Sequence, residues 1–257
     1  PAATGPVAAA STTGLELWLP SPATPDSPAR VLTELDYRAE PGAVNVILGA
    51  SGAGKSLLLR TLTGLLPDGA RTTGAVALHG RTLTPEGLAA ARGTETVLVP
   101  GSAATALNPV RTVAAQMRQT LKSAKRGSTP ADVASALAAA DVDPSLASCF
   151  PHELSGGQAQ RVVLALGVAV GARVLLVDEP TSALDAESSA RIEELLRAQA
   201  ACGTTVIMVT HDLAMTRRIA DLVAVVHDGR VVEAGRAEEL LAAPGHPATA
   251  ALLGGPA

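Results

Sequence analysis

The stretch Val44-Asn-Val-Ile-Leu48-Gly49-Ala-Ser-Gly-Ala-Gly54-Lys55-Ser56 decides the fold. Its first part, Val44 to Leu48, is a compact apolar run that ends at a glycine, which is typical of a buried parallel strand. Its second part, Gly49 to Ser56, matches the pattern of a phosphate-binding loop, and we predict a helix directly after it, over residues 55–66. Glycines let successive backbone N–H groups turn toward an anion, and the helix N-terminus adds the positive end of its dipole.

The phosphate-loop pattern predicts the roles of two polar side chains, Lys55 and Ser56. In this pattern Lys55 contacts the β and γ phosphates of a nucleotide, and the Ser56 hydroxyl binds Mg²⁺. A glycine-rich turn that binds nothing is the alternative. The nucleophile elbow of hydrolases is excluded, because Ala53 stands where that motif needs its second glycine. The predicted nucleotide contacts are Gly49, Ala50, Ser51, Gly52, Ala53, Gly54, Lys55, Ser56 and Leu57.

A second apolar run, Val174 to Val177, ends in two carboxylates, Asp178 and Glu179. Residues at the carboxyl edge of a parallel sheet face the ligand crevice. We therefore predict that Asp178 holds Mg²⁺ through water and that Glu179 polarises the attacking water as a general base. The alternative is an acidic strand end that faces solvent.

A further glycine pair follows Ser155 in Leu154-Ser-Gly-Gly-Gln158 and opens a predicted helix. Ser155, Gly156, Gly157 and Gln158 would form a second amide-rich surface at a helix N-terminus, suited to a phosphate. The alternative is a helix capped by a serine, a preferred N-cap residue.

Strands and helices alternate along the rest of the chain, which predicts an α/β fold with a mainly parallel sheet. Asp228-Gly229 between two apolar runs predicts a hairpin. Residues 1–14 are predicted to be a flexible tail, and residues 20–28, with four prolines, a surface loop. Further predicted strands cover residues 15–19, 97–99, 204–209, 222–226 and 230–234, and further helices cover 130–140, 158–170 and 187–201.

Composition excludes several classes of protein. Hydrophobic residues make up 47% of the 257 residues, so the chain can bury a core and is not intrinsically disordered. Aromatic residues are only 1% and the net charge is −4, so we expect no nucleic-acid partner. The apolar run from Val162 to Ala172 is too short to span a membrane. Cys149 and Cys202 are too few for a disulfide framework, which favours a reducing compartment.

In this order, the motifs resemble the nucleotide-binding subunits of ABC transporters over roughly residues 15–253, with 254–257 as a tail. Two further motifs belong to the set: Ser182-Ala-Leu-Asp185, and His211 after residues 206–210. The resemblance implies a P-loop NTPase fold of ABC type. That fold has a mainly parallel core, a small antiparallel β subdomain and a helical signature subdomain, here at about residues 102–160. It also implies ATP and Mg²⁺ as cofactors.

The resemblance further implies a head-to-tail dimer, in which Ser155 to Gln158 of one chain close on ATP held by the other. His211 would contact the γ phosphate and Asp185 would couple the two sites. From the residues alone, His211 would be an ordinary histidine at a strand end.

Three shorter motifs are similar to the ATPases of peptide and nickel importers: Leu107-Asn-Pro109, Phe150-Pro-His-Glu-Leu154, and residues 246–253. They imply an ATPase that powers uptake of a small solute (peptide, nickel or metallophore class) through separate membrane permease subunits. An extracytoplasmic solute-binding protein would take part indirectly. The chain would be a peripheral protein on the cytoplasmic face of a bacterial membrane. Two alternatives stay open: a non-transport ABC ATPase that acts as an assembly or regulatory factor, as its relatives linked to phosphonate enzymes would, and a weakly hydrolysing half of a heterodimer.

The chain departs from the family pattern at three places. Gly101 stands where the family has a glutamine that contacts Mg²⁺ and the membrane-subunit interface. We therefore expect slow, weakly coupled hydrolysis, and expect Gly101→Gln to raise the coupled rate. Leu166 replaces a usual arginine of the signature helix. No aromatic residue precedes Val31 to stack on adenine; Trp18 is the nearest, and a structural role is expected for it.

Overall fold

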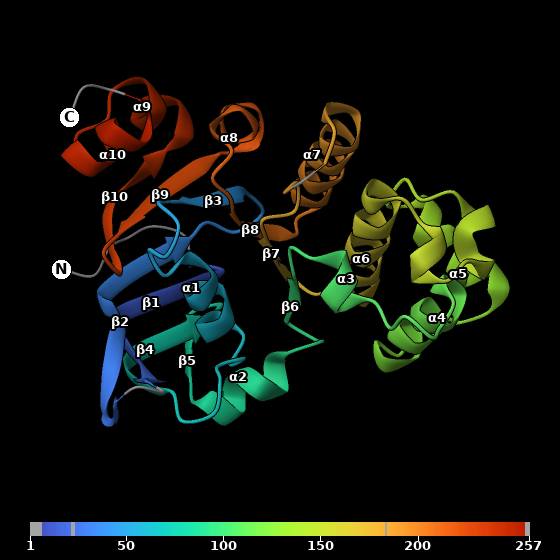
Figure 1. Ribbon diagram of the computed structural model, residues 1–257, viewed down its shortest axis with the longest axis horizontal. Coiled ribbons are helices and arrows are strands. Elements are labelled where there is room, and N and C mark those ends of the chain that lie inside the picture. The colour runs from blue at the N-terminus through green and yellow to red at the C-terminus, as the bar shows by residue number, and fades with distance from the viewer. Residues whose placement is uncertain (1–6, 22–23, 183, 255–257) are drawn as a thin grey trace.

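A six-stranded, mainly parallel sheet forms the centre of the computed structural model, which describes residues 7–21, 24–182 and 184–254 (Figure 1). The strand order is β10-β9-β3-β8-β7-β6, and only β10 runs antiparallel to its neighbour. The expected α/β fold with a parallel core is therefore confirmed. The strands are β3 (Val44–Leu48), β6 (Thr96–Val99), β7 (Val174–Asp178), β8 (Thr205–Val209), β9 (Leu222–His227) and β10 (Arg230–Arg236).

Side chains of the central strand alternate between the two faces of this sheet. Val46 and Leu48 of β3 pack into one apolar cluster, and Ile47 packs into the other. Burial on both faces explains why these strands are continuous apolar runs. Among the described residues, the helices outside residues 100–170 are α1 (Lys55–Leu62), α2 (Pro85–Ala91), α7 (Ala186–Ala201), α8 (Leu213–Ile219), α9 (Ala237–Ala242) and α10 (Pro247–Leu252).

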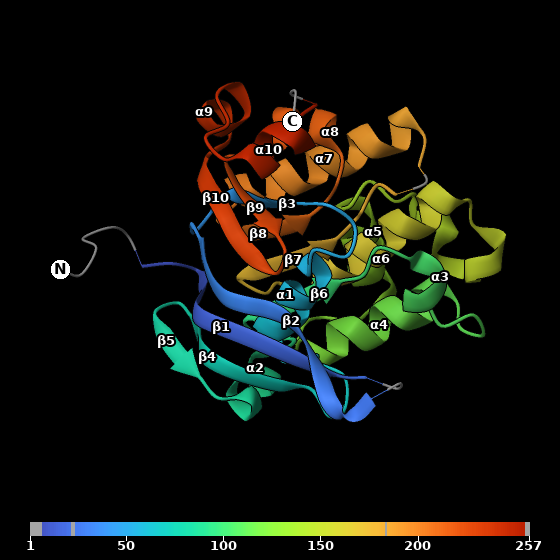
Figure 2. The ribbon, with the colours of Figure 1, turned by 60° about the vertical axis from the view of Figure 1, so that its left-hand side comes forward.

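A separate antiparallel sheet, in the order β2-β1-β4-β5, covers α1 (Figure 2). Leu58 and Leu62 of α1 lie in one cluster with Leu17 of β1 and Leu32 of β2, so the helix is packed between the two sheets. This is the small antiparallel β subdomain that the family resemblance implies. Its strands are β1 (Ala10–Ser21), β2 (Thr24–Ala39), β4 (Arg71–Leu78) and β5 (Arg81–Leu83).

Two predictions near the N-terminus are wrong. The tail was expected to reach residue 14, but β1 begins at Ala10, and Ala9 and Ala10 are buried. The proline-rich stretch 20–28 was expected to be a surface loop, but Thr24 to Pro28 belong to β2, with Ser21 paired to Thr24. Long β1–β2 pairing with buried leucines along it extends the strands past the local turn signal. Residues 1–6, 22–23 and 255–257 lie outside the described part of the chain.

Helices between residues 100 and 170 lie together, away from the antiparallel sheet (Figure 1, green to yellow). Met117 of α4 and Leu137 of α5 are fully buried among them. The helix α6 carries the glycine pair at its N-terminus and continues to Val170, where it reaches the parallel sheet. The elements are α3 (Ala103–Ala106), α4 (Val113–Ser123), α5 (Pro130–Ala138), α6 (Gly156–Val170) and the 3₁₀ turns η1 (Pro144–Ser148) and η2 (Pro151–Glu153).

Local turn chemistry sets two other boundaries. Asp228 and Gly229 both have positive φ, 47° and 72°, as a type I′ hairpin between β9 and β10 requires. The predicted hairpin is therefore confirmed. The helix α1 ends at Leu62 instead of residue 66, because Gly64 takes a left-handed conformation with φ 63°. Within the described residues, no helix has the length and apolar character needed to cross a bilayer.

Candidate nucleotide site

The glycine-rich loop connects β3 to α1, as predicted, and close packing dictates two of its glycines. A Cβ atom on Gly49 would lie 2.3 Å from the carbonyl oxygen of Val226 in β9. Gly54 precedes α1 with φ 99°, and a Cβ there would lie 2.6 Å from the Leu32 side chain. The loop therefore runs between the parallel sheet and the antiparallel sheet with no room for side chains at these positions.

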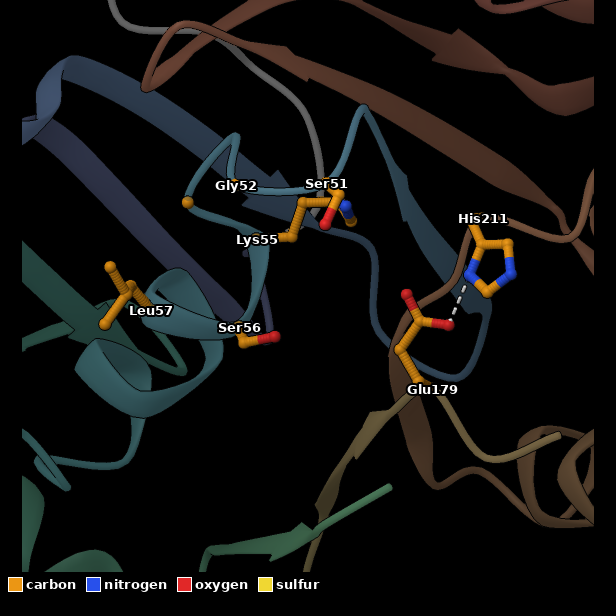
Figure 3. Close-up of a pocket in the computed structure, with 8 residues that line it drawn as sticks. Ser51, Gly52, Lys55, Ser56, Leu57, Glu179 and His211 are labelled. Atoms are coloured by element: carbon orange, nitrogen blue, oxygen red, sulfur yellow. Dashed lines mark hydrogen bonds and ion pairs between the residues drawn. The ribbon is translucent and has the colours of Figure 1, made fainter. Parts of the chain in front are cut away.

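Lys55 reaches back over this loop. Its ammonium group donates hydrogen bonds to the carbonyl oxygens of Gly49 and Ala50, each at 2.8 Å, and the side chain is buried (Figure 3). Burial lowers the pKa of Lys55, while the charges of Glu179 and Asp178 oppose that shift. An anion in the loop would give this desolvated cation a charged partner in place of neutral carbonyls.

Ser56 and Asp178 meet beside the loop. The Ser56 hydroxyl donates a 2.8 Å hydrogen bond to Oδ1 of Asp178. In the described part of the chain, no group of three or more His, Cys, Asp or Glu side chains could hold a metal ion alone. A hydroxyl and a carboxylate are hard oxygen ligands, and Mg²⁺ usually keeps several waters and uses phosphate oxygens as well. These residues therefore fit Mg²⁺ that arrives with a nucleotide.

Glu179 and His211 lie next to each other, on the side of the site opposite Lys55 and the phosphate loop (Figure 3). Glu179 follows β7 and His211 follows β8, and Nδ1 of His211 lies 2.6 Å from Oε2 of Glu179. Glu179 has φ 50°, a left-handed conformation that is uncommon outside glycine and typical of functional sites. One cavity of about 430 Å³ is lined by Ser51, Gly52, Gly54, Lys55, Ser56, Leu57, Glu179 and His211.

The signature residues lie elsewhere in the same chain. Ser155 caps α6: its hydroxyl accepts from the Gln158 N–H at 3.2 Å, and Gln158 Oε1 accepts from the Ser155 N–H at 2.9 Å. Ser155 is therefore an N-cap residue, as in the alternative interpretation of this motif as a capped helix. Of the described residues, Ser155, Gly156, Gly157 and Gln158 are not among those that line the cavity at Lys55. Within one chain, the structure therefore does not bring the signature to the phosphate loop.

Asp185 lies next to the signature helix of its own chain. It caps α7 by accepting hydrogen bonds from the N–H and hydroxyl of Ser188, which hold the pKa of Asp185 below its usual value. A Cβ atom on Gly157 would lie 2.4 Å from the Ser188 hydroxyl. Asp185 and Gln158 line a second cavity of about 550 Å³. The motif of Asp185 and the signature thus share one surface.

The structure places Trp18 and the two residues that depart from the family pattern, Leu166 and Gly101. Trp18 pairs with Arg30 and Arg71 in the antiparallel sheet and is not among the described residues that line the nucleotide cavity. Leu166 lines a groove next to β6. A Cβ atom on Gly101 would lie 2.5 Å from the carbonyl oxygen of Asp178. A side chain at position 101 would therefore require this backbone to shift, and the expectation that Gly101→Gln raises the coupled rate stays a prediction.

Sequence reasoning missed Gln160. This residue of α6 is only 3% exposed, and its Nε2 donates to the carbonyl oxygen of Pro100 at 3.5 Å. A glutamine on the buried, otherwise apolar face of a predicted helix was the available signal.

Comparison with known proteins agrees with this geometry. The ABC transporter family model matches residues 32–182. The chain is 36% identical to the oligopeptide transport ATP-binding protein OppD of Mycobacterium tuberculosis over 90% of its own length, but spans 39% of that relative. It is 40% identical to the nickel import ATP-binding protein NikD of Pseudomonas putida, covering 86% of this chain and 87% of the relative.

Solved structures share the fold at lower identity. A dimeric ATP-binding cassette bound to ADP and Pi superposes with a TM-score of 0.77 and 23% identity, over 89% of this chain and 98% of that one. A subunit of the CbiONQ transporter from Clostridium perfringens gives a TM-score of 0.75 and 23% identity, over 91% of each chain. With the family model matching more than half of its length, the chain belongs to the ABC transporter family.

Proposed function

We propose that this chain is the ATP-binding and ATP-hydrolysing subunit of an importer. One observation carries the proposal: a single cavity brings the buried ammonium of Lys55 together with Ser56, Glu179 and His211. Phosphoryl transfer to water uses groups of these kinds. They are a cation, a hydroxyl next to a carboxylate, and a second carboxylate that is hydrogen-bonded to an imidazole.

Each group has a task in hydrolysis. Lys55 exchanges its bonds with the Gly49 and Ala50 carbonyls for bonds to the β and γ phosphates. Glu179 accepts the proton of the attacking water, and the contact with His211 orients its carboxylate. Ser56 and Asp178 would hold Mg²⁺, which neutralises charge developing on the phosphate oxygens.

The remaining motif residues support a dimer. Ser155 and Gly156 are exposed at the N-terminus of α6, and Ser155 to Gln158 are not among the described residues that line the phosphate-loop cavity of the same chain. In a head-to-tail dimer, this surface closes on ATP held by the partner, and Asp185, beside the signature helix, links the two sites. The similar cassette bound to ADP and Pi is itself dimeric. The partner is a second copy of this chain or a related ATPase subunit.

The transport role rests on the relatives. They are named as ATP-binding proteins of oligopeptide transport and of nickel import. We infer uptake of a small solute of the peptide, nickel or metallophore class through separate permease subunits, with a solute-binding protein acting on the outer side. The chain would then be peripheral, on the cytoplasmic face of a bacterial membrane.

Two measurements test this function. An affinity-tagged chain, expressed in its own host, should co-purify with hydrophobic membrane subunits, and the isolated complex should hydrolyse ATP. Hydrolysis without membrane partners would favour a non-transport ABC ATPase. Tight ATP binding without turnover would favour the weakly hydrolysing half of a heterodimer, a role that the missing side chain at Gly101 also permits.

A further inference from the structure

The hairpin between β9 and β10 lies against β2 of the other sheet. The N–H of Thr33 in β2 donates a 2.9 Å hydrogen bond to the carbonyl oxygen of Gly229 in the turn of the hairpin. Beside this bond, Arg230 pairs with Glu34 at 2.8 Å. A Cβ atom on Gly229 would lie 2.5 Å from the carbonyl oxygen of Val31. One end of β2 therefore packs directly on a turn that belongs to the parallel sheet.

The same part of β2 also lies against the phosphate loop. A Cβ atom on Gly54 would lie 2.6 Å from the Leu32 side chain and 3.3 Å from the carbonyl oxygen of Val31. The Val31 carbonyl is therefore close both to Gly54 of the loop and to Gly229 of the hairpin. This carbonyl is backbone, which cannot swing aside as the far end of a flexible side chain can. A shift of β2 away from the turn would therefore move it relative to the loop.

The strand that leads into the hairpin holds the other end of the loop. The carbonyl oxygen of Val226 in β9 lies 2.3 Å from the position of a Cβ atom on Gly49. Gly49 begins the phosphate loop, and Gly54 is its last residue before Lys55. The hairpin thus contacts the start of the loop directly and its end through β2. A loop that is already held in one conformation binds its ligand more tightly, because less ordering is needed on binding.

Gly229 meets two requirements, and only one of them comes from the turn. Its φ of 72°, next to Asp228 with φ 47°, fits a type I′ turn. Asparagine also tolerates a left-handed conformation, so the turn alone does not demand glycine. The approach of Val31 does, because any other residue would place a Cβ atom 2.5 Å from its carbonyl oxygen.

We propose that Gly229 is a positioning residue for the phosphate loop: its bare Cα lets β2 lie between the hairpin and Gly54, and this packing fixes the loop in the form that binds ATP. The inference rests on the proposed function, in which this loop holds the phosphates. It gives the turn between β9 and β10 a part in nucleotide affinity, in addition to its part in the sheet.

The test uses the full chain with any subunits that co-purify, and compares Gly229→Asn with Asp228→Asn. Both variants place asparagine at a left-handed position of the same turn, but the Asp228 side chain is 89% exposed and only Gly229→Asn adds a side chain against β2. Calorimetry measures the dissociation constant of ATP. We expect Gly229→Asn to raise this constant on the order of tenfold, within the usual range of coupling between distinct sites. Asp228→Asn should bind ATP as wild type does.

A second measurement separates positioning from general damage. Hydrolysis of bound ATP, followed in a single turnover, should change less than affinity in Gly229→Asn, because Glu179 and His211 follow β7 and β8 and not the strands that the substitution disturbs. A merely structural role would lower the unfolding temperature of Gly229→Asn but leave the ATP affinity of the folded protein unchanged.

Charge reversal tests the same contact without changing a glycine, which keeps the test open should Gly229→Asn fail to fold. Arg230→Glu would place two carboxylates opposite each other and push the hairpin away from β2. We expect the dissociation constant of ATP to rise only about two- to fivefold, because this pair is exposed. Adding Glu34→Arg should restore wild-type affinity, since the pair is then re-formed with its charges exchanged.

Wild-type ATP affinity in folded Gly229→Asn or in Arg230→Glu would overturn the inference. An equal loss of affinity in Asp228→Asn would overturn it too, because turn chemistry would then explain the effect. Lys55→Ala distinguishes this failure from that of the proposed function. Wild-type affinity in Lys55→Ala would mean that the loop does not hold the phosphates, whereas a loss there beside wild-type affinity in Gly229→Asn would strike the inference alone.

Discussion

The Glu179 carboxylate and the His211 imidazole meet at 2.6 Å, although 32 residues separate them in the sequence. The register of the parallel sheet explains this contact. Asp178 of β7 is paired with Val209 of β8, so the residues that follow each strand emerge side by side at the same edge. The phosphate loop leaves β3 at that edge too, because β3 is the other neighbour of β8. Sheet order, more than any local motif, assembles the site.

Lys55→Ala should weaken ATP binding strongly. The ammonium is buried and donates to the carbonyl oxygens of Gly49 and Ala50, so bonds from it to phosphates would be charged and desolvated. Hydrogen bonds to charged groups contribute about 1.5–3 kcal/mol each, so the dissociation constant should rise at least about tenfold. Calorimetry measures it, with Lys122→Ala, at an exposed lysine of α4, as the control. Wild-type affinity in Lys55→Ala would refute the assignment of the loop.

Ser155→Arg should damage catalysis at the partner's site. Ser155 is exposed and is not among the described residues that line its own chain's phosphate cavity, so the chain carrying the substitution should still bind ATP. The bulky cation would block the surface that closes on the partner's γ phosphate, and hydrolysis should be lost. Ser135→Arg, at an exposed position of α5, is the matched control. Loss of the variant's own ATP binding would contradict the head-to-tail arrangement.

Arg218→Ala should destabilise the fold. Arg218 of α8 makes two hydrogen bonds, at 2.8 and 2.7 Å, to Glu193 of α7, whose side chain is only 9% exposed. Removing the arginine leaves that carboxylate without its charged partner, at a cost of about 1.5–3 kcal/mol in unfolding free energy. Urea denaturation measures this cost.

Arg230→Ala provides the comparison for that measurement. Arg230 pairs with Glu34, whose side chain is 68% exposed, and solvent screens such a pair. Its loss should change stability by less than about 1 kcal/mol. Equal effects of the two substitutions would mean that the Arg218–Glu193 contact contributes no more than a surface pair.

The parts of the fold that local chemistry determines were predictable from the sequence. The glycine spacing before Lys55 marked the phosphate loop, and Asp228-Gly229 marked the hairpin. The apolar run up to Asp178 marked β7, because a strand buried on both faces has no polar alternation. Each of these signals is contained within a few neighbouring residues.

Features set by distant contacts were not predictable in this way. The prolines near Pro20 indicated a loop, but pairing of β1 with β2 extends both strands into that stretch. In the sequence, Gly101 appeared only as the absence of the family's glutamine, and the structure adds that a Cβ atom there would lie 2.5 Å from the Asp178 carbonyl oxygen. Gln160 donates a hydrogen bond to Pro100, which is 60 residues away in the sequence, so its neighbours in the chain do not indicate this contact.

Hydrolysis of bound ATP by Glu179→Gln tests the central claim most directly. The amide is nearly the same size as the carboxylate but cannot accept the proton from water, so ATP binding should stay at wild-type strength. The chemical step should slow by at least about a hundredfold, the lower range for loss of a general base. A closed, ATP-bound dimer should then accumulate on sizing chromatography with ATP and Mg²⁺. Wild-type turnover in Glu179→Gln, with no ATP-dependent change in size, would contradict the assignment of Glu179 as the base.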